Sequence, residues 1–257
     1  MISILTKLKK SEKNRVTLRF PQIDPAGIMF YPRYFEIALR RFPVLPFSAP
    51  PYTLTTQFIR PNRLGDTLDL SLQHDIELSS WLVTGLLQDE EHFSIRLLKD
   101  GADLTDDAHF PALPAFTSDE SEIGAWAVGC DSRMILSRYF ELLNMTIEEW
   151  FEDTLEIPFF ELHYGRNIAI PTVQFDTIIR GFPSIGSSAT VGLRPITLGK
   201  RAMTFKSWLV VDDQCLVENK QVIVFVKTHD DGYEAIQIPG YIRERFEKQL
   251  ENTGKGK

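Results

Sequence analysis

The sequence predicts an α+β protein in which a helix and a run of antiparallel strands occur twice along the chain. Three observations carry this prediction: a strand–helix–strands order in each half, a stretch without periodicity between the halves, and short sequence matches at corresponding places. The 257 residues suit one large domain or two ordinary ones, and the repetition favours two. With 43% apolar residues, the chain has ample material for a core.

The first half opens with a strand and a helix that have clear sequence signals. Residues 16–20 alternate apolar and polar side chains, as a half-buried strand does. Pro32 falls in the first turn of the next helix, where its missing N–H costs nothing. Aromatic and apolar residues at helical spacing form one face of this helix: Tyr31, Tyr34, Phe35, Ala38 and Phe42. Prolines between 43 and 51 end it, and we expect strands at 53–59, 67–76, 81–87 and 93–98.

A linker and a second copy of the pattern follow. Residues 101–122 are rich in Asp, Pro, Ala, Ser and Thr and show no sustained period. We therefore expect units at 1–104 and 123–257, joined by a linker at 105–122. In the second unit we expect a strand at 125–130, a long amphipathic helix at 132–153, strands at 171–179, 189–196, 202–211, 221–227 and 234–238, and a closing helix from Tyr241.

The two halves also match in letters. Arg-Tyr-Phe-Glu at residues 33–36 recurs at 138–141, and each copy follows an aspartate, Asp24 in one half and Asp131 in the other. Further along, an apolar residue and a glycine at 64–65 match 185–186, and the turn at 79–81 matches 200–204. Four landmarks in the same order indicate a duplicated unit in which a sheet wraps around its own helix.

Composition excludes several classes of protein. Lys and Arg total 28 against 35 Asp and Glu, a net charge of −7, so no basic surplus is available for a nucleic-acid backbone. No run of eighteen apolar residues predicts a membrane span, and residues 1–13 do not resemble a secretory signal. Cys130 and Cys215 form no pair or cluster, and the five histidines show no metal spacing, so we expect a cytoplasmic protein with no metal and no cofactor.

One segment resembles a known family. Residues 24–35, Asp-Pro-Ala-Gly-Ile-Met-Phe-Tyr-Pro-Arg-Tyr-Phe, resemble the signature segment of hotdog-fold acyl-CoA thioesterases of the 4-hydroxybenzoyl-CoA thioesterase type. Residues 58–66, 222–226 and 235–239 add weaker matches in the same order. The resemblance implies two hotdog units in one chain, a tandem or double hotdog, with an active site where the units pair. It implies an acyl-CoA substrate and an intramolecular hotdog pair, and leaves open whether two chains form a homodimer.

The residues of this segment suit thioester hydrolysis. The reaction needs a nucleophile or general base near the carbonyl carbon, and donors where the carbonyl oxygen becomes negative. Asp24 offers the carboxylate, and Gly27 lets the loop turn sharply into a helix with unpaired N–H groups at its positive end. By the resemblance, Asp24 acts as nucleophile or as base for water, and the backbone N–H of Tyr31 is the oxyanion donor. An aspartate in a turn can also simply cap a helix.

The other candidate residues have weaker signals. Asp131 is predicted as a second catalytic carboxylate or a helix cap, and the cap is favoured because its loop lacks the glycine of the first copy. In relatives, the stretch matching 161–171, with His163, contributes to the acyl pocket. Arg60 and Arg63 are candidates for binding the phosphates of the CoA part of the substrate. Exposed arginines beside a turn are, however, often only solvated. We expect the first half to provide the catalytic loop and the second to shape the pocket.

Alternative chemistries are less well supported. Hydratases of this fold need a histidine paired with a carboxylate, and no histidine follows Asp24 or Asp131 in the same loop or helix. Residues 181–188 approach a phosphate-loop pattern but lack its lysine. Hydrolysis of acyl-CoA to free acid and CoA is therefore the predicted activity. The alternative is a catalytically silent protein that binds acyl thioesters.

Overall fold

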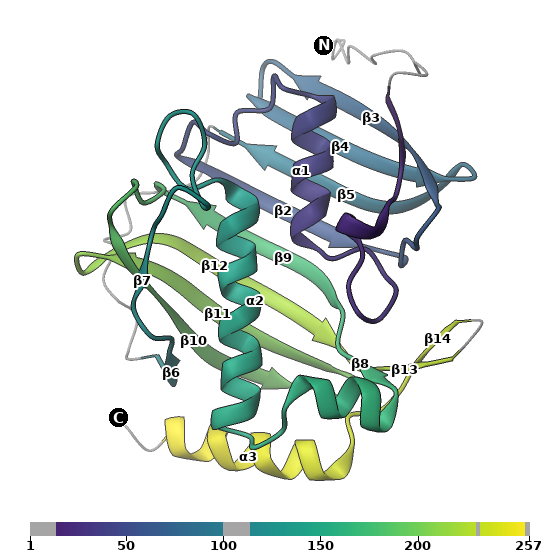
Figure 1. Ribbon diagram of the computed structural model, residues 1–257, viewed down its shortest axis with the longest axis vertical. Coiled ribbons are helices and arrows are strands. Elements are labelled where there is room, and N and C mark those ends of the chain that lie inside the picture. Colours follow the sequence, from purple (N-terminus) through teal and green to yellow (C-terminus); the bar gives the residue numbers. More distant parts are fainter. Residues whose placement is uncertain (1–13, 100–113, 230–231, 255–257) are drawn as a thin grey trace.

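The computed structural model describes residues 14–99, 114–229 and 232–254. Within them, most strands join one large antiparallel sheet, and α1 and α2 lie side by side over the same face of it (Figure 1). The expected lead-in at 1–13 and most of the expected linker lie outside the described residues. The elements of the first half are β1 (Arg15–Thr17), the 3-10 turn η2 (Phe20–Gln22), α1 (Pro32–Arg41), β2 (Tyr52–Phe58), β3 (Thr67–Asp75), β4 (Ser80–Leu87) and β5 (Glu90–Leu98).

The second half repeats this order with additions near its end. Its elements are β6 (Phe116–Thr117), β7 (Ser121–Glu122), α2 (Leu136–Asp153), the π-helical turn η3 (Glu161–Gly165), β8 (Ile168–Ala169), β9 (Thr172–Ile179), β10 (Ser188–Leu198), β11 (Ala202–Val211), β12 (Gln214–Val224), β13 (Val226–Thr228), β14 (Tyr233–Ala235) and α3 (Gly240–Gly254). The added β8, β13 and β14 form a small separate sheet in the order β14-β13-β8.

The large sheet is continuous across the two halves. Its order is β1-β3-β4-β5-β2-β9-β12-β11-β10-β6, with β7 also paired to β10, so each half contributes one end. The halves join where β2 pairs antiparallel with β9, from Tyr52 opposite Ile179 to Gln57 opposite Gln174. Because backbone hydrogen bonds cross this junction, the two halves are fixed side by side rather than connected only by a loop.

The two helices meet through the repeated Arg-Tyr-Phe-Glu motif. Pro32 opens α1, and its apolar face is buried against the sheet. The rings of Phe35 and Phe140, corresponding members of the motif, stack with centroids 4.5 Å apart and planes 10° from parallel. Arg33 Nη1 lies 2.8 Å from Glu141 Oε1 across the same contact. An aromatic pair of this kind is worth about 0.5–1.5 kcal/mol beyond its buried area, so the repeated letters help hold the halves together.

The loops before the two helices have the same hydrogen-bond pattern. Backbone bonds recur in pairs of nearly equal length: Leu18 N–H to Asp66 O (2.8 Å) with Ile123 N–H to Ser187 O (2.9 Å), and Met29 N–H to Asn62 O (2.8 Å) with Met134 N–H to Pro183 O (2.9 Å). Gly65 and Gly186 both have positive φ, +89° and +82°, in the turn that receives these bonds. The glycines matched in the sequence therefore occupy corresponding turns, which positive φ reserves largely for glycine.

Two expectations about the start of the second half are wrong. Residues 125–130 do not form a strand but a turn, which ends where Val128 bridges Met134. The helix begins at Leu136 rather than at 132, because the residues before it form the loop that corresponds to the one before α1. Residues 125–130 are mainly apolar, yet only Ala127 among them is buried, and a short apolar run does not by itself establish a strand.

The expected linker also ends earlier than predicted. Its described part contains β6 and β7, which pair with β10 and so belong to the sheet of the second half. Ser121 and Glu122 lie opposite Ala189 and Ser188, in the position that β1 takes against β3 in the first half. The second unit thus includes residues that their polar composition placed in the linker.

Candidate active site

A cavity of about 650 Å³ lies between the two halves, beside the loop that precedes α1. The first half contributes that loop and the end of β2. The second half contributes one side of α2, η3, and parts of β8, β9, β13 and β14. Among the lining residues are Asp24, Tyr31, Tyr34, Phe58, Arg60, Asn144, Glu148, Phe159, Phe160, His163, Tyr164 and Tyr233. Its walls are mainly apolar and aromatic, with a few polar groups, as in ligand-binding sites generally.

Asp24 is held by its own loop but still faces the cavity. Its Oδ1 accepts the N–H of Ile28 at 3.1 Å, while its backbone N–H donates to the Ile28 carbonyl at 2.8 Å. Burial raises the pKa of this carboxyl from 3.8 to about 6, although the N–H groups of Ile28, Ala26 and Gly27 and the nearby His163 lower it. A carboxylate with a pKa close to neutral pH is well suited to proton transfer or nucleophilic attack.

The loop then turns into the amino end of α1. Gly27 has φ +80°, a conformation that other residues adopt at a cost. Among the described residues, no backbone carbonyl accepts the N–H of Tyr31, whereas the N–H of Phe30 donates to Gln22 O. Tyr31 lines the cavity at the positive end of the helix, where an oxyanion is stabilised. Its side chain has a separate role, because the buried hydroxyl donates to Phe140 O at 3.0 Å and ties the loop to α2.

The three predicted substrate-binding residues have different surroundings. His163 lines the cavity, and its Nε2 lies 2.8 Å from the Pro25 carbonyl oxygen. Arg60 lines the cavity and forms an ion pair with Glu90. Arg63 is not among the lining residues, and its guanidinium carbon lies 5.0 Å from the centre of the Tyr233 ring. The structure thus brings Asp24, Tyr31, His163 and Arg60 together.

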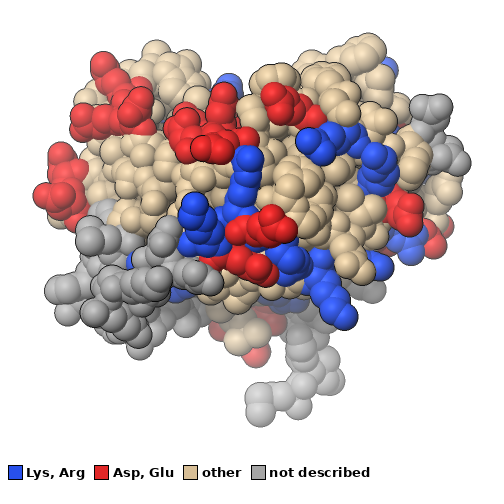
Figure 2. All heavy atoms as spheres, turned by 90° about the horizontal axis from the view of Figure 1, so that it is seen from below, with Lys and Arg blue, Asp and Glu red and all other residues tan. Residues whose placement is uncertain are grey.

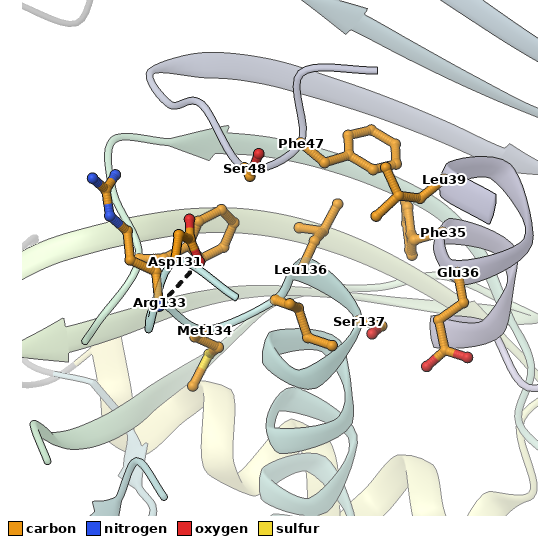
Figure 3. A pocket seen from close by; sticks show the side chains of 12 residues that line it. Phe35, Glu36, Leu39, Phe47, Ser48, Asp131, Arg133, Met134, Leu136 and Ser137 are labelled. Atoms are coloured by element: carbon orange, nitrogen blue, oxygen red, sulfur yellow. Dashed lines mark hydrogen bonds between the residues drawn. The ribbon is translucent and has the colours of Figure 1, made fainter. Parts of the chain in front are cut away.

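Asp131 lies elsewhere, in the wall of a smaller cavity of about 100 Å³ near the start of α2 (Figure 3). It is exposed, and its Oδ1 accepts the N–H of Arg133 at 3.2 Å, the dashed line in Figure 3. A carboxylate bonded to its own loop in this way is a turn cap. Asp131 is not among the residues that line the large cavity, so the structure does not place it with Asp24, and its hydrogen bond fits the capping role that the sequence favoured over a catalytic one.

The backbone hydrogen bonds show why the sequence match between Asp24 and Asp131 was misleading. The N–H of Gly129 donates to the Arg133 carbonyl at 2.9 Å, as that of Asp24 does to Ile28, so Gly129 occupies the position of Asp24. Ser132, with φ +61°, occupies the position of Gly27. The two loops have equal lengths, and Asp131 corresponds to Ala26. Matching the halves by their aspartates displaced the alignment by two residues.

Sequence reasoning missed several residues of the cavity. Asn144 and Glu148 face it from successive turns of α2, with Asn144 Nδ2 donating to Glu148 Oε1 at 2.6 Å. Tyr233 reaches it from β14, about two hundred residues after the loop that it contacts, where its hydroxyl donates to Ala26 O at 3.0 Å. The 3.6-residue spacing of α2 could have indicated the first pair, whereas nothing around Tyr233 signals its position.

Some site types have no counterpart in the described residues. Within 14–99, 114–229 and 232–254, no three His, Cys, Asp or Glu side chains cluster as metal ligands would. The helices described there include none with the length and apolar character needed to cross a bilayer. Figure 2 views the side on which α3 and η3 lie in Figure 1, and Lys and Arg side chains gather in the middle of that face, interspersed with acidic ones.

Comparisons with solved structures show the fold. A chain from Lactobacillus plantarum with the provisional name oleoyl thioesterase matches 82% of this chain and 94% of its own length, with a TM-score of 0.59 and 11% identity. A 1,4-dihydroxy-2-naphthoyl-CoA thioesterase from Synechocystis matches 52% of this chain and 94% of its own, with a TM-score of 0.46 and 11% identity.

A 4-hydroxybenzoyl-CoA thioesterase variant in complex with 4-hydroxybenzoyl-CoA matches 51% of this chain and 96% of its own, with a TM-score of 0.47 and 14% identity. No protein-family model and no curated protein matches the sequence. The likeness to the Lactobacillus plantarum chain, which extends over both halves, shows that this chain has the hotdog fold.

Proposed function

We propose that this protein is a tandem hotdog enzyme that hydrolyses acyl-CoA thioesters at one site between its two halves. The observation that carries the proposal is the position of Asp24, whose carboxyl has a pKa of about 6 and faces a cavity of about 650 Å³ at the amino end of α1. The hotdog fold and the resemblance of residues 24–35 to thioesterase segments support it. As in related folds, the chemistry depends on the site rather than on the fold itself.

The reaction can proceed by two routes that use the same residues. As a base, Asp24 takes a proton from water while the water oxygen bonds to the thioester carbon, the C–S bond breaks, and CoA leaves as a thiol after protonation. As a nucleophile, the carboxylate oxygen bonds to that carbon, the thiolate leaves, and water then hydrolyses the resulting anhydride. In both routes the carbonyl oxygen of the thioester becomes negatively charged, and the backbone N–H of Tyr31 stabilises this charge.

The halves contribute unequally to this site. The first half supplies Asp24 and the start of α1, while α2 and η3 of the second half supply most of the opposite wall. The corresponding loop of the second half has Gly129 where the first has Asp24, and its neighbouring cavity of about 100 Å³ is small for an acyl chain. We therefore propose one working site per chain.

The apolar walls suit the acyl group, and positive side chains suit the CoA phosphates. Arg60 lines the cavity, where it forms an ion pair with Glu90. The Lactobacillus plantarum chain carries the name of an oleoyl thioesterase, so the substrate panel should include long unsaturated chains beside short and aromatic acyl groups.

The test is thiol release from a panel of acyl-CoAs, measured with a thiol-reactive dye. We expect release by the wild-type protein and loss of release in Asp24→Asn, which keeps the shape of the side chain without its charge. Asp131→Asn is the matched control, because Asp131 lies in the corresponding loop but outside the cavity. Acyl-CoA binding without release from any member of the panel would contradict hydrolysis and indicate a silent acyl-thioester binder.

A further inference from the structure

Two successive peptide units of the Asp24 loop are held from the second half. The Pro25 carbonyl oxygen lies 2.8 Å from His163 Nε2 in η3, and the Ala26 carbonyl oxygen accepts the Tyr233 hydroxyl of β14 at 3.0 Å. In a trans peptide unit, the N–H points away from the C=O. The opposite side of the turn is tied to Asp24, because the Gly27 N–H donates to the Asp24 backbone carbonyl at 3.0 Å and the Ile28 N–H donates to Asp24 Oδ1 at 3.1 Å. The N–H groups of Ala26 and Gly27 also lower the pKa of the Asp24 carboxyl.

These units therefore link side chains of the second half to the turn that holds Asp24. Their carbonyl ends accept hydrogen bonds from His163 and Tyr233, and the N–H end of the second unit, that of Gly27, donates to the Asp24 backbone carbonyl. Such chained hydrogen bonds polarise one another and fix the orientation of the peptide planes. Without the side chains of the second half, this partly exposed four-residue turn could rotate its N–H groups away from Asp24.

Tyr233 is itself held in place by the first half. The Arg63 guanidinium carbon lies 5.0 Å from the centre of the Tyr233 ring, and burial raises the pKa of the tyrosine hydroxyl while the positive charge of the arginine lowers it. Arg63 is fixed in turn, because its backbone N–H donates to Asp66 Oδ2 at 2.7 Å and it bridges to Ile28 beside Asp24. The chain of contacts thus runs from Arg63 to Tyr233 to Ala26, crossing between the halves twice.

We propose that Tyr233 is a positioning residue for Asp24, acting with His163 through the carbonyls of Ala26 and Pro25. This inference rests on the proposed thioester hydrolysis and adds to it a residue that orients the reacting carboxylate. It also assigns Arg63 a role different from phosphate binding, because the arginine holds the tyrosine. The tandem arrangement then has a catalytic purpose, since the second half fixes the geometry of the loop that the first half provides.

The first test removes only the hydroxyl of Tyr233. In Tyr233→Phe we expect kcat to fall about five- to tenfold, with KM changing less than about twofold, as the loss of one positioning hydrogen bond predicts. Tyr241→Phe is the matched control: Arg166 lies over the Tyr241 ring with its guanidinium carbon 4.5 Å from the centre, and Tyr241 is not among the cavity-lining residues. A kcat in Tyr233→Phe within twofold of the wild type would overturn the proposal.

The second test asks whether His163 acts as a donor. His163→Gln keeps an N–H group that can reach the Pro25 carbonyl, whereas His163→Leu removes it. We expect Gln to retain most of the wild-type kcat and Leu to lose about five- to tenfold. The double variant of Tyr233→Phe and His163→Leu should lose less than the product of the single losses, because both act on one carboxylate. Equal losses for Gln and Leu would contradict positioning through the carbonyl.

The third test measures Asp24 directly and does not depend on turnover. The titratable groups facing this carboxyl are His163 from η3, Tyr34 from α1 and Tyr233 from β14. With aspartate labelled by ¹³C in its carboxyl, NMR titration should show the Asp24 midpoint rising by about half a pH unit or more in Tyr233→Phe, since the loop N–H groups no longer stabilise its charge. An unchanged midpoint would overturn the proposal even if the variant were less active.

These results separate two kinds of failure. If wild-type protein releases no thiol, or Asp24→Asn releases it as fast, the proposed function fails, and the NMR titration still decides whether Tyr233 positions Asp24. If the wild type is active and Asp24→Asn is not, while Tyr233→Phe behaves as the wild type in kcat and titration, only the positioning role fails. Thermal unfolding of each variant checks that the loss of activity is not a loss of folded protein.

Discussion

The loops before α1 and α2 have the same backbone hydrogen-bond pattern but carry different side chains. Both close with the same pattern of hydrogen bonds, yet Asp24 in the first loop is replaced by Gly129 in the second, and Gly27 by Ser132. The first loop borders a cavity of about 650 Å³ and the second one of about 100 Å³. The difference shows that a repeated framework can keep its backbone geometry while only one copy has a carboxylate beside a large cavity.

The surroundings of the loops differ because the chain continues differently after each helix. Helix α2 runs from Leu136 to Asp153, and a short connection leads from it to η3, which supplies His163 and part of the wall of the large cavity. Helix α1 ends at Arg41, and the chain after it folds back so that Leu45 and Phe47 are buried. Phe47 lines the small cavity. The longer connection after α2, in the second half, therefore forms part of the cavity beside the loop of the first half.

The sharpest comparison of the loops exchanges the two aspartates for asparagine. In Asp24→Asn we expect kcat/KM to fall about 10²- to 10⁴-fold, the range for losing a general base or nucleophile. In Asp131→Asn we expect no change beyond about twofold, because the side chain only caps its own turn. Steady-state thiol release from the best substrate of the panel measures both. A comparable loss in the two variants would contradict a single working site.

The pH dependence of activity should report the first loop alone. Both routes require Asp24 as a carboxylate, and its pKa is about 6. We therefore expect kcat/KM to be constant above about pH 7 and to fall about tenfold per pH unit well below pH 6. The same profile is expected for Asp131→Asn. Activity that stays level down to about pH 4.5 would show that no group with the titration of Asp24 is needed.

Stability should also distinguish the loops. The folded-state pKa of Asp24 is raised above 3.8, so folding favours the protonated form, and the penalty for the charged form develops as pH rises through about 4 to 6. At about pH 8 we expect Asp24→Asn to be more stable than the wild type by on the order of 1–3 kcal/mol, and at about pH 4 by much less. Denaturant unfolding at both pH values measures this. A variant less stable than the wild type at the higher pH would contradict the burial argument.

A smaller effect is expected from exchanging the two positive-φ residues. Gly27 has φ +80° and Ser132 has φ +61°. Gly27→Ser should destabilise the protein by about 1 kcal/mol and lower activity, whereas Ser132→Gly should change stability by less than about 0.5 kcal/mol with activity unchanged. Thermal unfolding and thiol release measure both variants. Equal effects of the two substitutions on thiol release would contradict the proposal that only the first loop contributes to catalysis.

The sequence allowed the architecture to be predicted because the signals were local. The Arg-Tyr-Phe-Glu copies, the alternation in 67–76 and the glycines at 65 and 186 each reflect the conformation of their own segment. Asp24 could be proposed as a site residue for the same reason, because it lies in a continuous segment with Gly27 and the start of α1. The strand expected at 125–130 is absent because a short apolar run does not determine its own conformation, and only Ala127 of that run is buried.

The rest of the site depends on contacts between distant segments. Tyr233 reaches Ala26 only because β13 and β14 fold back past the loop of the other half. Arg63 likewise contacts Tyr233 in the opposite half, and the sequence around Arg63 does not indicate this contact. Asp131 was matched to Asp24 because the halves were aligned by residue type. The backbone hydrogen bonds show that Gly129 is the residue that corresponds to Asp24.

The most direct test of the account is the number of substrate sites per chain. Isothermal titration of the wild-type protein with a non-hydrolysable thioether analogue of its best acyl-CoA substrate counts them, without relying on turnover. We predict one analogue bound per chain, at the cavity beside Asp24. Two equivalent analogues per chain would mean that both loops form sites, and would contradict the division of work between the two halves.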